Sequence, residues 1–524
     1  MKSSFKYFIL IFLVLGVGCK KDLLETIPND RIVSSEFWKL EKDAIIASNA
    51  VYTFLDGTNA IEREMLTDIA HNNQVYSTIA AMEKGAFNAQ NDVIAEEWAN
   101  DYQGIRAANY FLENVDKVPS TNVELISSLK GEIRFIRAYL YSKLVSIYGN
   151  VPLVTKSISI EEGKNLVQSP ASAVWDYIDK ELTEAAEQLP EMQVEKGRIT
   201  RGAALSLKAR AMLYAKRYQD AADAAERVID GGVYSIYPSY ENLFTYAAEN
   251  NPEIILNKEF VKNSYPNNIC EILPPFSILS NEMSVVPLKK IVDAYEMKNG
   301  KKITDPSGGF DPYNPYQNRD PRLLFSIYAP GSMLPNGKIF DSSPNSGTAD
   351  ALGSGYRPSV TGFNVRKYVN KEDIDEVNNS GINIILIRYA EVLLTYAEAK
   401  VELGQIDESV LEAINKVRQR GDVKMPVIAP GHTQDELREI VRHERMVELA
   451  FEGQRFFDIR RWNIANDVFN VPIQGMTYSN NGQLITAKQE SFVRSFNPQR
   501  DYLWPIPQKE MDLNKNLKQN PGWF

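Results

Sequence analysis

Residues 452–462 read EGQRFFDIRRW and belong to a series of short motifs from which the architecture of the chain can be predicted. The motifs before this segment are IRYAEVLL at 387–394, YAEA at 396–399, NKVR at 415–418 and HER at 443–445. The motifs after it are LWPIP at 503–507 and QNPGW at 519–523. We expect residues 384–462 to form a helical block and residues 463–524 to form an extended tail.

A capping box marks the start of the long helix in this block. Thr433 can cap the helix, and Glu436, three residues later, can return the hydrogen bond. The apolar residues that follow fall on one face at about 100° per residue; they are Leu437, Ile440, Val441, Val447 and Phe451.

Glu444 and Glu448 lie within that apolar face, with Glu452 a turn further on. Because carboxylates are rarely buried unless they are paired, one interpretation is a buried ion-pair network that joins helix to helix. The nearby cations are Arg445, Arg455, Arg460 and Arg461. The alternative is a glycoside hydrolase that uses Glu444 and Glu448, since such enzymes place two carboxyls about 5–10 Å apart. Carboxylates on one helix lie in a row and not across a cleft, which favours the network.

In kind and order, these words resemble the C-terminal signature of the SusD/RagB family. Further words of the same kind are WxxxYxxIxxxN from Trp98, RAY at 137–139, YGNVP at 148–152, VDAYEM at 292–297 and RDPRL at 319–323. The family consists of outer-membrane lipoproteins that bind nutrients, mostly glycans, for a TonB-dependent transporter. The resemblance covers nearly the whole mature chain, and it implies a non-enzymatic glycan-binding protein with a SusC-like transporter as partner.

Residues 1–18 are typical of a lipoprotein signal peptide. Lys2 and Lys6 are followed by an apolar run at 7–17, which is too short to span a bilayer. GVGC at 16–19 then predicts lipid attachment at Cys19; the alternative is an ordinary export signal with an incidental cysteine. KKD at 20–22 resembles the export tags of surface-exposed lipoproteins. It implies a lipid-anchored protein on the extracellular side of the outer membrane, the inner leaflet being the alternative.

Charge and motifs exclude several classes of function. The formal net charge is −10, and no basic block is interleaved with aromatic residues, so nucleic acid is not an expected partner. There are 3 histidines and no Gly-x-Ser-x-Gly, phosphate loop, HExxH or Cys-x-x-Cys motif. We therefore expect no catalytic residue, no metal site and no cofactor. Some family members hold a structural Ca²⁺, but the resemblance assigns no residues to one here.

Helical hairpins of the tetratricopeptide type occur twice. Thr200 opens a helix, and Ala209, Tyr218 and Ala221 match the repeat pattern, while residues 403–413 give a second, poorer match. Since the two hairpins lie far apart in sequence, we predict a discontinuous scaffold and not one unbroken superhelix.

A loop-rich block separates the two hairpins. From about residue 234 to residue 382 the composition shifts to Pro, Asn, Gly, Ser and Tyr, with a possible short strand at 254–256. Binding residues tend to lie on loops held by a rigid scaffold, so we expect the ligand site here, joined by the loop at 68–80. A sugar offers apolar faces and hydroxyls, and it requires aromatic rings beside polar groups. The residues predicted to bind it are Asp68, Asn72, Tyr76, Tyr313, Tyr316, Tyr356 and Arg357.

The fold class predicted from these patterns is mainly α. A tetratricopeptide-like scaffold carries a large loop-rich, ligand-facing region with a few short strands. We expect two sequence halves, 19–245 and 246–524, the second beginning with the loop-rich segment 246–383. The leading functional hypothesis is capture of an oligosaccharide for the transporter. The alternatives are a RagB-like peptide cargo and a tetratricopeptide-type assembly protein at the outer membrane.

Overall fold

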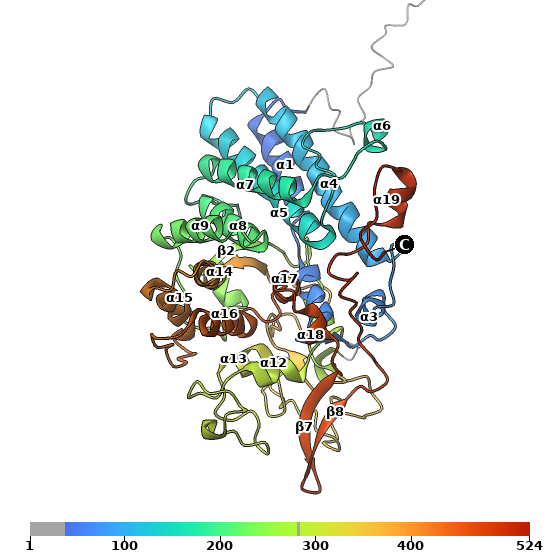
Figure 1. Ribbon diagram of the computed structural model, residues 1–524, viewed down its shortest axis with the longest axis vertical. Coiled ribbons are helices and arrows are strands. Elements are labelled where there is room, and N and C mark those ends of the chain that lie inside the picture. The colour runs from blue at the N-terminus through green and yellow to red at the C-terminus, as the bar shows by residue number, and fades with distance from the viewer. Residues whose placement is uncertain (1–36, 280–282, 524) are drawn as a thin grey trace, which may run out of the picture.

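The computed structural model describes residues 37–279 and 283–523. The predicted signal peptide and Cys19 lie outside this range. Helices dominate the described chain, and each of these helices is too short or too polar to serve as a membrane span. The mainly α fold class is confirmed, with short strands and long irregular segments beside the helices (Figure 1).

Nine helices and one short strand make up the first half of the described chain. Strand β1 (Ala70–Asn72) follows the second helix. The helices are α1 (Glu41–Tyr52), α2 (Thr58–Glu62), α3 (Thr78–Glu83), α4 (Asp92–Asn114), α5 (Val123–Tyr148), α6 (Ile160–Gly163), α7 (Ala171–Gln188), α8 (Arg201–Tyr214) and α9 (Tyr218–Asp230).

The second half begins with the loop-rich segment and ends with further helices. Its helices are α10 (Ile269–Ile272), α11 (Phe276–Leu279), α12 (Lys289–Ala294), α13 (Arg322–Ser326), α14 (Tyr389–Glu402), α15 (Glu408–Arg418), α16 (Gln434–Glu448), α17 (Arg455–Arg461), α18 (Ala465–Phe469) and α19 (Gln508–Leu513). Its strands are β2 (Ile254–Lys258), β3 (Val285–Pro287), β4 (Ile327–Tyr328), β5 (Asn364–Val365), β6 (Ile384–Arg388), β7 (Gln474–Asn480) and β8 (Gln483–Lys488).

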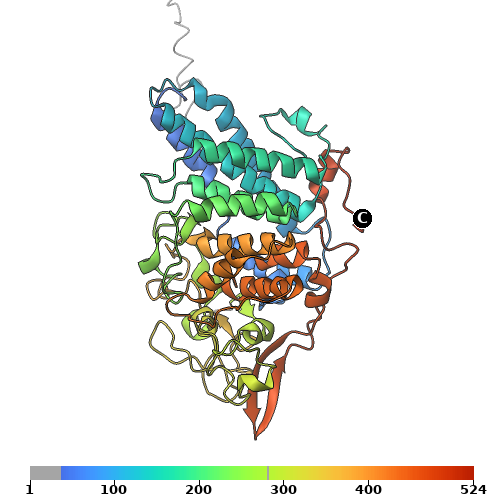
Figure 2. The ribbon, with the colours of Figure 1, turned by 60° about the vertical axis from the view of Figure 1, so that its left-hand side comes forward.

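The long helices stack in one array that is continuous in space. Each of α4, α5, α7, α8 and α9 packs on the next, and α9 packs on α14, which in turn contacts α15 and α16. Figure 2 shows these layers from blue through green to orange, with the loop-rich segment beneath them. The predicted discontinuity of the scaffold is therefore one of sequence, where residues 231–388 interrupt it, and the helices of the two halves pack together in space.

Small side chains and one ion pair explain why the two hairpin sets join. Helix α9 buries four alanines at 221, 222, 224 and 225, and small residues at a contact let helices approach closely. Arg210 on α8 donates from Nε to Glu391 on α14 at 2.6 Å. Tyr396 on α14 also donates to Glu226 on α9 at 3.4 Å. The chain thus leaves the array after α9 and re-enters it beside the same helix.

The strands form only two-stranded antiparallel pairs in the described chain. The pairs are β1 with β3, β2 with β6, β4 with β5 and β7 with β8. Strand β2 confirms the short strand expected at 254–256. The β7–β8 hairpin projects from the loop-rich end of the molecule (Figure 1).

Helix α16 starts as predicted but ends earlier than its apolar pattern indicates. The Thr433 hydroxyl accepts from the Glu436 N–H, and the Glu436 carboxylate accepts from the Thr433 N–H at 2.8 Å, which confirms the capping box. The helix ends at Glu448, and Phe451 has φ 62°. Because that left-handed backbone cannot continue a helix, Phe451 and Glu452 lie in the turn that leads to α17.

The C-terminal tail is less extended than expected. It contains α18, the β7–β8 hairpin and α19, and it then returns to the first half of the chain. The backbone N–H of Trp504 donates to the Ile147 carbonyl at 2.8 Å, and Asn520 Nδ2 donates to the Tyr148 carbonyl at 2.8 Å. The tryptophan ring is buried against Tyr148 and Phe456. The tail therefore fixes the end of α5 to the C-terminal half.

Candidate functional site

The β1–β3 pair brings two distant loops together. Asn72 lies opposite Val285 in this pair, so the loop after β1 meets the loop before β3. The first loop is part of the segment 68–80 in which ligand contacts were predicted. The described part of the second loop, residues 283 and 284, belongs to the loop-rich segment.

A buried ion pair fixes the start of the first loop. Arg455 on α17 donates two parallel hydrogen bonds of 2.8 Å to the Asp68 carboxylate, and Lys290 lies 2.6 Å from the same group. Burial alone would raise the pKa of Asp68, but the two cations hold it well below its usual range. Asp68 is fully buried, and its observed contacts are those of a support for the loop.

A second buried cluster lies under β1. His71 Nδ1 is 3.1 Å from Glu83 Oε1, and Glu83 Oε2 accepts from the Asn72 N–H at 3.2 Å. Arg494 Nη2 donates to Glu83 Oε1 at 2.9 Å. No group of three or more His, Cys, Asp or Glu side chains in the described chain is arranged to hold a metal ion. The contacts of His71 and Arg494 with Glu83 therefore support the strand from beneath.

Asn72 shapes the loop, and Asn73 ties it to a third segment. Asn72 is buried; its Oδ1 accepts from the Gln74 N–H at 2.9 Å, and its Nδ2 donates to the Ser77 hydroxyl. Asn73 donates from its backbone N–H to the Ser284 carbonyl at 2.8 Å. Its Oδ1 accepts from the Val360 N–H at 2.9 Å. One asparagine thus holds three loops in a fixed relation.

Two exposed tyrosines stand on the segments that Asn73 joins. Tyr76 is 99% exposed, three residues after Asn73, and Tyr356 is 60% exposed, four residues before Val360. The Tyr356 ring lies 5.3 Å from the Phe276 ring at a tilt of 41°, so this aromatic side chain is backed by another. Arg357 is exposed beside it. The surface offers aromatic faces next to polar groups, which is the chemistry that a sugar requires.

The other two predicted tyrosines lie elsewhere in the loop-rich segment. The exposed Tyr313 donates its hydroxyl to the Gly482 carbonyl, at the turn between β7 and β8, at 3.1 Å. Tyr316 is partly buried, with its ring 6.2 Å from Phe363 and its hydroxyl enclosed. Burial raises the pKa of Tyr316. The structure therefore links the segments that carry Tyr76 and Tyr356 through Asn73, and it associates Tyr313 with the hairpin tip. A binding role for each of the seven residues stays a prediction.

The carboxylates of α16 form a buried network. Glu444 pairs with Arg322 at 2.5 Å and with Arg418 at 2.8 Å. Glu448 pairs with Arg322, Arg388 and Arg420 at 2.6–2.8 Å. These cations hold the pKa of both carboxyls below the usual range, against the opposite effect of burial.

This network differs in its partners from the expectation. The expected partners were the cations near α16 in sequence, Arg445, Arg455, Arg460 and Arg461. The observed partners come from other segments, because α16 turns the face that carries Glu444 and Glu448 towards α13, α15 and β6. Arg445 pairs instead with Asp458 at 3.1 Å. Since Glu444 and Glu448 are fully enclosed and satisfied by guanidinium groups, they do not flank a cleft that could admit a glycosidic bond.

A sequence model described as the SusD family matches residues 252–523. A second model, described as starch-binding associating with outer membrane, matches residues 30–213. The chain belongs to the SusD family.

Relatives and solved structures agree with this assignment. A SusD-like protein, P2, of Formosa agariphila is 26% identical over 99% of this chain and 100% of its own. The crystal structure of a SusD-like carbohydrate-binding protein from Bacteroides fragilis superposes with a TM-score of 0.85, at 30% identity, over 92% of this chain and 100% of its own. A laminarin-binding SusD-like protein shares the fold with a TM-score of 0.70, at 23% identity, over 93% of this chain and 100% of its own.

In this SusD family member, two features of the site were not assigned from the sequence. The ring of Phe276 supports Tyr356, and the preceding Pro274-Pro275 pair is the signal that could have indicated a turn presenting an aromatic residue. The linking role of Asn73 depends on contacts across more than 200 positions, and no local pattern in the sequence indicates it.

Proposed function

We propose that this protein captures an oligosaccharide at the surface of the outer membrane and passes it to a SusC-like TonB-dependent transporter. The observation that carries the proposal is the pair of exposed tyrosines, Tyr76 and Tyr356, on loops that Asn73 holds together. A preformed aromatic surface lets a sugar stack with little loss of loop entropy.

The family supports a carbohydrate as the ligand class. One family model is described as starch-binding and associated with the outer membrane, and structural relatives are described as carbohydrate-binding and laminarin-binding. A lipid on Cys19 would hold the protein at the membrane, on the extracellular side. Delivery requires release, so we expect dissociation constants in the micromolar to millimolar range, about −8 to −4 kcal/mol.

Calorimetry tests the ligand and the site together. The chain from residue 20 onward is titrated with a panel of oligosaccharides, including laminarin and starch fragments, and with a panel of peptides. We expect at least one oligosaccharide to bind. In the double variant Tyr76→Ala and Tyr356→Ala, its affinity should fall by roughly tenfold or more, since both rings withdraw apolar sugar surface from water at about 25 cal/mol per Å².

Tyr313→Ala is the matched control. It removes an exposed tyrosine of the same segment that donates to the hairpin tip, and we expect little change in affinity. If Tyr313→Ala abolishes binding and the double variant does not, the site lies at the hairpin. If only peptides bind, the cargo is of the RagB type.

The transporter and the absence of catalysis have separate tests. Affinity purification of the full-length, membrane-anchored protein should recover a TonB-dependent barrel. A Cys19→Ala variant should lose its membrane attachment. Incubation with the bound oligosaccharide should leave its length unchanged, whereas shortened products would contradict a purely binding role.

A further inference from the structure

An open groove of about 740 Å³ runs between α1, the start of α5 and the loop 189–200 that joins α7 to α8. Helices α1 and α7 lie toward the end of the molecule opposite the β7–β8 hairpin (Figure 1). None of the residues that line the groove belongs to the segment 68–80 or to the loop-rich segment. The groove is therefore separate from the loops of Tyr76 and Tyr356.

Exposed apolar side chains border this groove. Val123 on α5 is 75% exposed, and Met192 and Val194 in the loop are 76% and 102% exposed. Ile45 on α1 and Leu125 on α5 also line the groove and are half-buried. Single exposed apolar residues are ordinary on a protein surface, but a group of them around one groove is typical of an interaction surface.

The loop holds Met192 and Val194 in place. Between them, Gln193 Nε2 donates to the Ser128 hydroxyl at 3.0 Å and to the Ile199 carbonyl at 2.8 Å. Gln193 is half-buried, whereas both of its neighbours are exposed. An anchored loop loses little conformational entropy when a partner binds.

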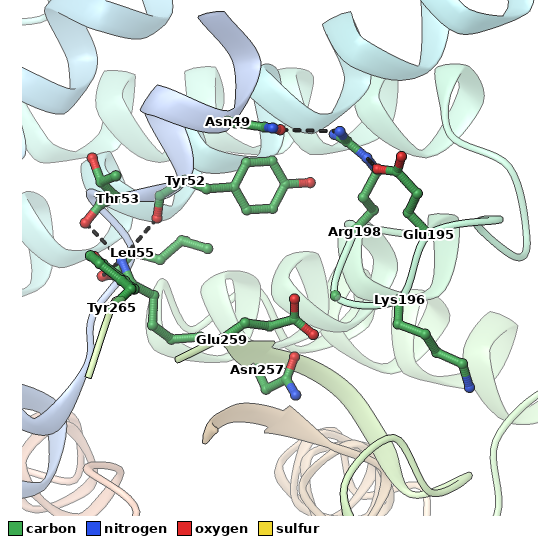
Figure 3. Close-up of a pocket in the computed structure, with 12 residues that line it drawn as sticks. Asn49, Tyr52, Thr53, Leu55, Glu195, Lys196, Arg198, Asn257, Glu259 and Tyr265 are labelled. Atoms are coloured by element: carbon green, nitrogen blue, oxygen red, sulfur yellow. Dashed lines mark hydrogen bonds and ion pairs between the residues drawn. The ribbon is translucent and has the colours of Figure 1, made fainter. Parts of the chain in front are cut away.

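Both arginines that line the groove are already paired. Arg198 donates to Glu195 at 2.7 Å and to Asn49 Oδ1 at 3.1 Å, and Figure 3 shows these contacts from the neighbouring cavity. Arg201 pairs with Glu191 at 3.3 Å. Neither cation is therefore left for an anionic ligand.

The lining carries an excess of negative charge. Its ionisable side chains are four glutamates and two arginines, which gives a net charge of −2. Glu124 and Glu187 are exposed, and their carboxylates form no hydrogen bond or ion pair within the described residues. Glu124 lies in the first turn of α5, where a carboxylate also favours the helix.

The position of Glu187 is unfavourable for its own helix. It is the residue before the last of α7, where the helix dipole favours a cation. The carboxylate of Glu187 therefore does not stabilise the helix end, and its exposed charge is available to a partner.

The groove also lies close to the start of the described chain. That chain begins at Phe37, 18 residues after Cys19, and α1 forms one wall of the groove. A segment of this length spans at most roughly 60 Å. A lipid on Cys19 would therefore keep this end of the protein near other components of the membrane.

We propose that this groove docks a segment of the TonB-dependent transporter that carries apolar side chains flanked by lysine or arginine. The inference rests on the proposed function, which supplies the transporter as partner. Apolar side chains of that segment pack on Val123, Met192 and Val194, and its cations pair with Glu124 and Glu187. A lipid surface fits less well, because charged membrane surfaces are anionic and attract basic segments.

Photo-crosslinking tests the contact directly. In the full-length, membrane-anchored protein, Val194 is replaced by the photo-crosslinker benzoylphenylalanine, and the products of irradiation are identified by mass spectrometry. We expect an adduct with the TonB-dependent barrel. The same replacement at Leu513, which is 65% exposed at the end of α19, should give none. An adduct with lipid or with a second copy of this chain, and none with the barrel, would overturn the proposal.

A double variant tests the apolar contact. Met192→Asp with Val194→Asp removes apolar surface and adds like charge, so affinity purification should recover roughly tenfold less barrel or lower. The matched control, Val427→Asp with Leu513→Asp, changes two side chains of 58% and 65% exposure outside the groove and should leave recovery unchanged. Equal losses in the two double variants would contradict a specific contact at the groove.

Glu187→Lys tests the charge. Recovery of the barrel should fall by roughly threefold or more at low salt and by less at high salt. The thermal midpoint should rise, because a cation now lies near the helix C-terminus. Unchanged recovery at low salt would show that the negative charge of the groove does not contact the transporter.

Calorimetry separates a failure of this inference from a failure of the proposed function. The groove variants should bind the oligosaccharide as the wild type does, which also shows that they are folded. If wild type and groove variants recover the barrel equally, the transporter remains the partner and its docking surface lies elsewhere. If the wild type recovers no barrel, the partnership and this inference fail together.

Discussion

Glu448 shows how this protein stabilises a charge in its interior. Its carboxylate lies 2.6–2.8 Å from the guanidinium groups of Arg322, Arg388 and Arg420, and all four side chains are enclosed. Burying a charge is costly unless it is paired and hydrogen-bonded. Each arginine comes from a different part of the chain, so the network orders α13, β6 and the segment after α15 around α16.

Replacing the Glu448 carboxylate should therefore lower the free energy of unfolding. In Glu448→Gln the three guanidinium groups lose one shared negative charge, and we expect the free energy of unfolding to fall by about 3–5 kcal/mol. Urea denaturation followed by circular dichroism measures it. The control is Glu161→Gln, which breaks an exposed pair with Lys164 and should cost less than about 1 kcal/mol. Equal effects in the two variants would refute the role of the network.

Glu64 is a buried carboxyl of the opposite kind, because no cation within residues 37–279 and 283–523 forms an ion pair with it. Its Oε1 accepts from the Gly453 N–H at 2.7 Å, and burial raises its pKa to about 8, although the backbone N–H groups of Gly453 and Arg455 act the other way. The folded state therefore holds a proton on Glu64 at pH values where the unfolded chain has released it.

This proton gives Glu64 a defined pH dependence. Between the unfolded pKa near 4.5 and the folded pKa near 8, the native state binds more protons, so the contribution of this group to stability falls as pH rises. The contribution of Glu64 to the free energy of unfolding falls by about 1.4 kcal/mol per pH unit at most. Glu64→Gln keeps an acceptor for Gly453 and does not titrate. The stability difference, variant minus wild type, should therefore rise from pH 5 to pH 8, as urea titrations at several pH values would show. A difference independent of pH would contradict the raised pKa.

At the scale of elements, close approach between helices depends on glycine. Gly104 lies on the buried face of α4, where a Cβ would lie 2.5 Å from Leu140 Cδ1 on α5 and 2.9 Å from Phe54 Cβ. Both distances are shorter than a carbon–carbon contact allows. The absence of a side chain at Gly104 is thus a condition for the packing of α4 on α5 and on Phe54 in the turn after α1.

Gly104→Ala should lower the thermal midpoint. Glycine to alanine within a helix would by itself stabilise by roughly 0.5–1 kcal/mol, but overpacking of a core typically costs about 1–3 kcal/mol, so we expect a net loss. The control is Gly163→Ala at the end of α6, where the nearest atom to a new Cβ is 3.9 Å away, and this variant should be neutral or slightly stabilised. If Gly104→Ala raised the thermal midpoint as much as Gly163→Ala, α5 would have to be able to move away from the new Cβ.

Local features of the helices could be predicted from the sequence, and their long-range partners could not. The capping box at Thr433 and the hairpin helices are local, and they are confirmed. The end of α16 was misplaced, because the spacing of Phe451 continues the apolar face while its backbone takes φ 62°. The identity of the partners of Glu444 and Glu448 was also missed, since Arg322 and Arg388 lie more than 55 positions away.

The candidate site was predictable in composition and not in arrangement. Tyr76 and Tyr356 stand out as tyrosines in polar loops, but their grouping depends on the β1–β3 pair and on Asn73. Asp68 has the same polar character in the sequence, and only the structure reveals that Arg455 encloses it. Loop residues that bind and loop residues that support carry the same local signal.

At the scale of the whole molecule, the two sequence halves form one folded unit. Contacts across residues 245 and 246 include Arg210 with Glu391, Asp68 with Arg455, and Tyr148 with Asn520. The apolar core is continuous through both halves. Because α9 packs on α14, either half alone would expose a helical face that is buried in the complete chain.

We therefore expect neither half to fold by itself. Fragments 20–245 and 246–524, expressed separately, should bind a hydrophobic dye and melt without a cooperative transition, whereas the intact chain should unfold in one step. Co-expressed, the two fragments should associate and recover the cooperative transition, because the interface between them contains ion pairs as well as apolar surface. Arg210→Ala in the first fragment should weaken that association, since it leaves Glu391 enclosed without its cation. A cooperative melt of the 20–245 fragment alone would show instead that the first five layers of the array are an independent domain on which the rest of the chain assembles.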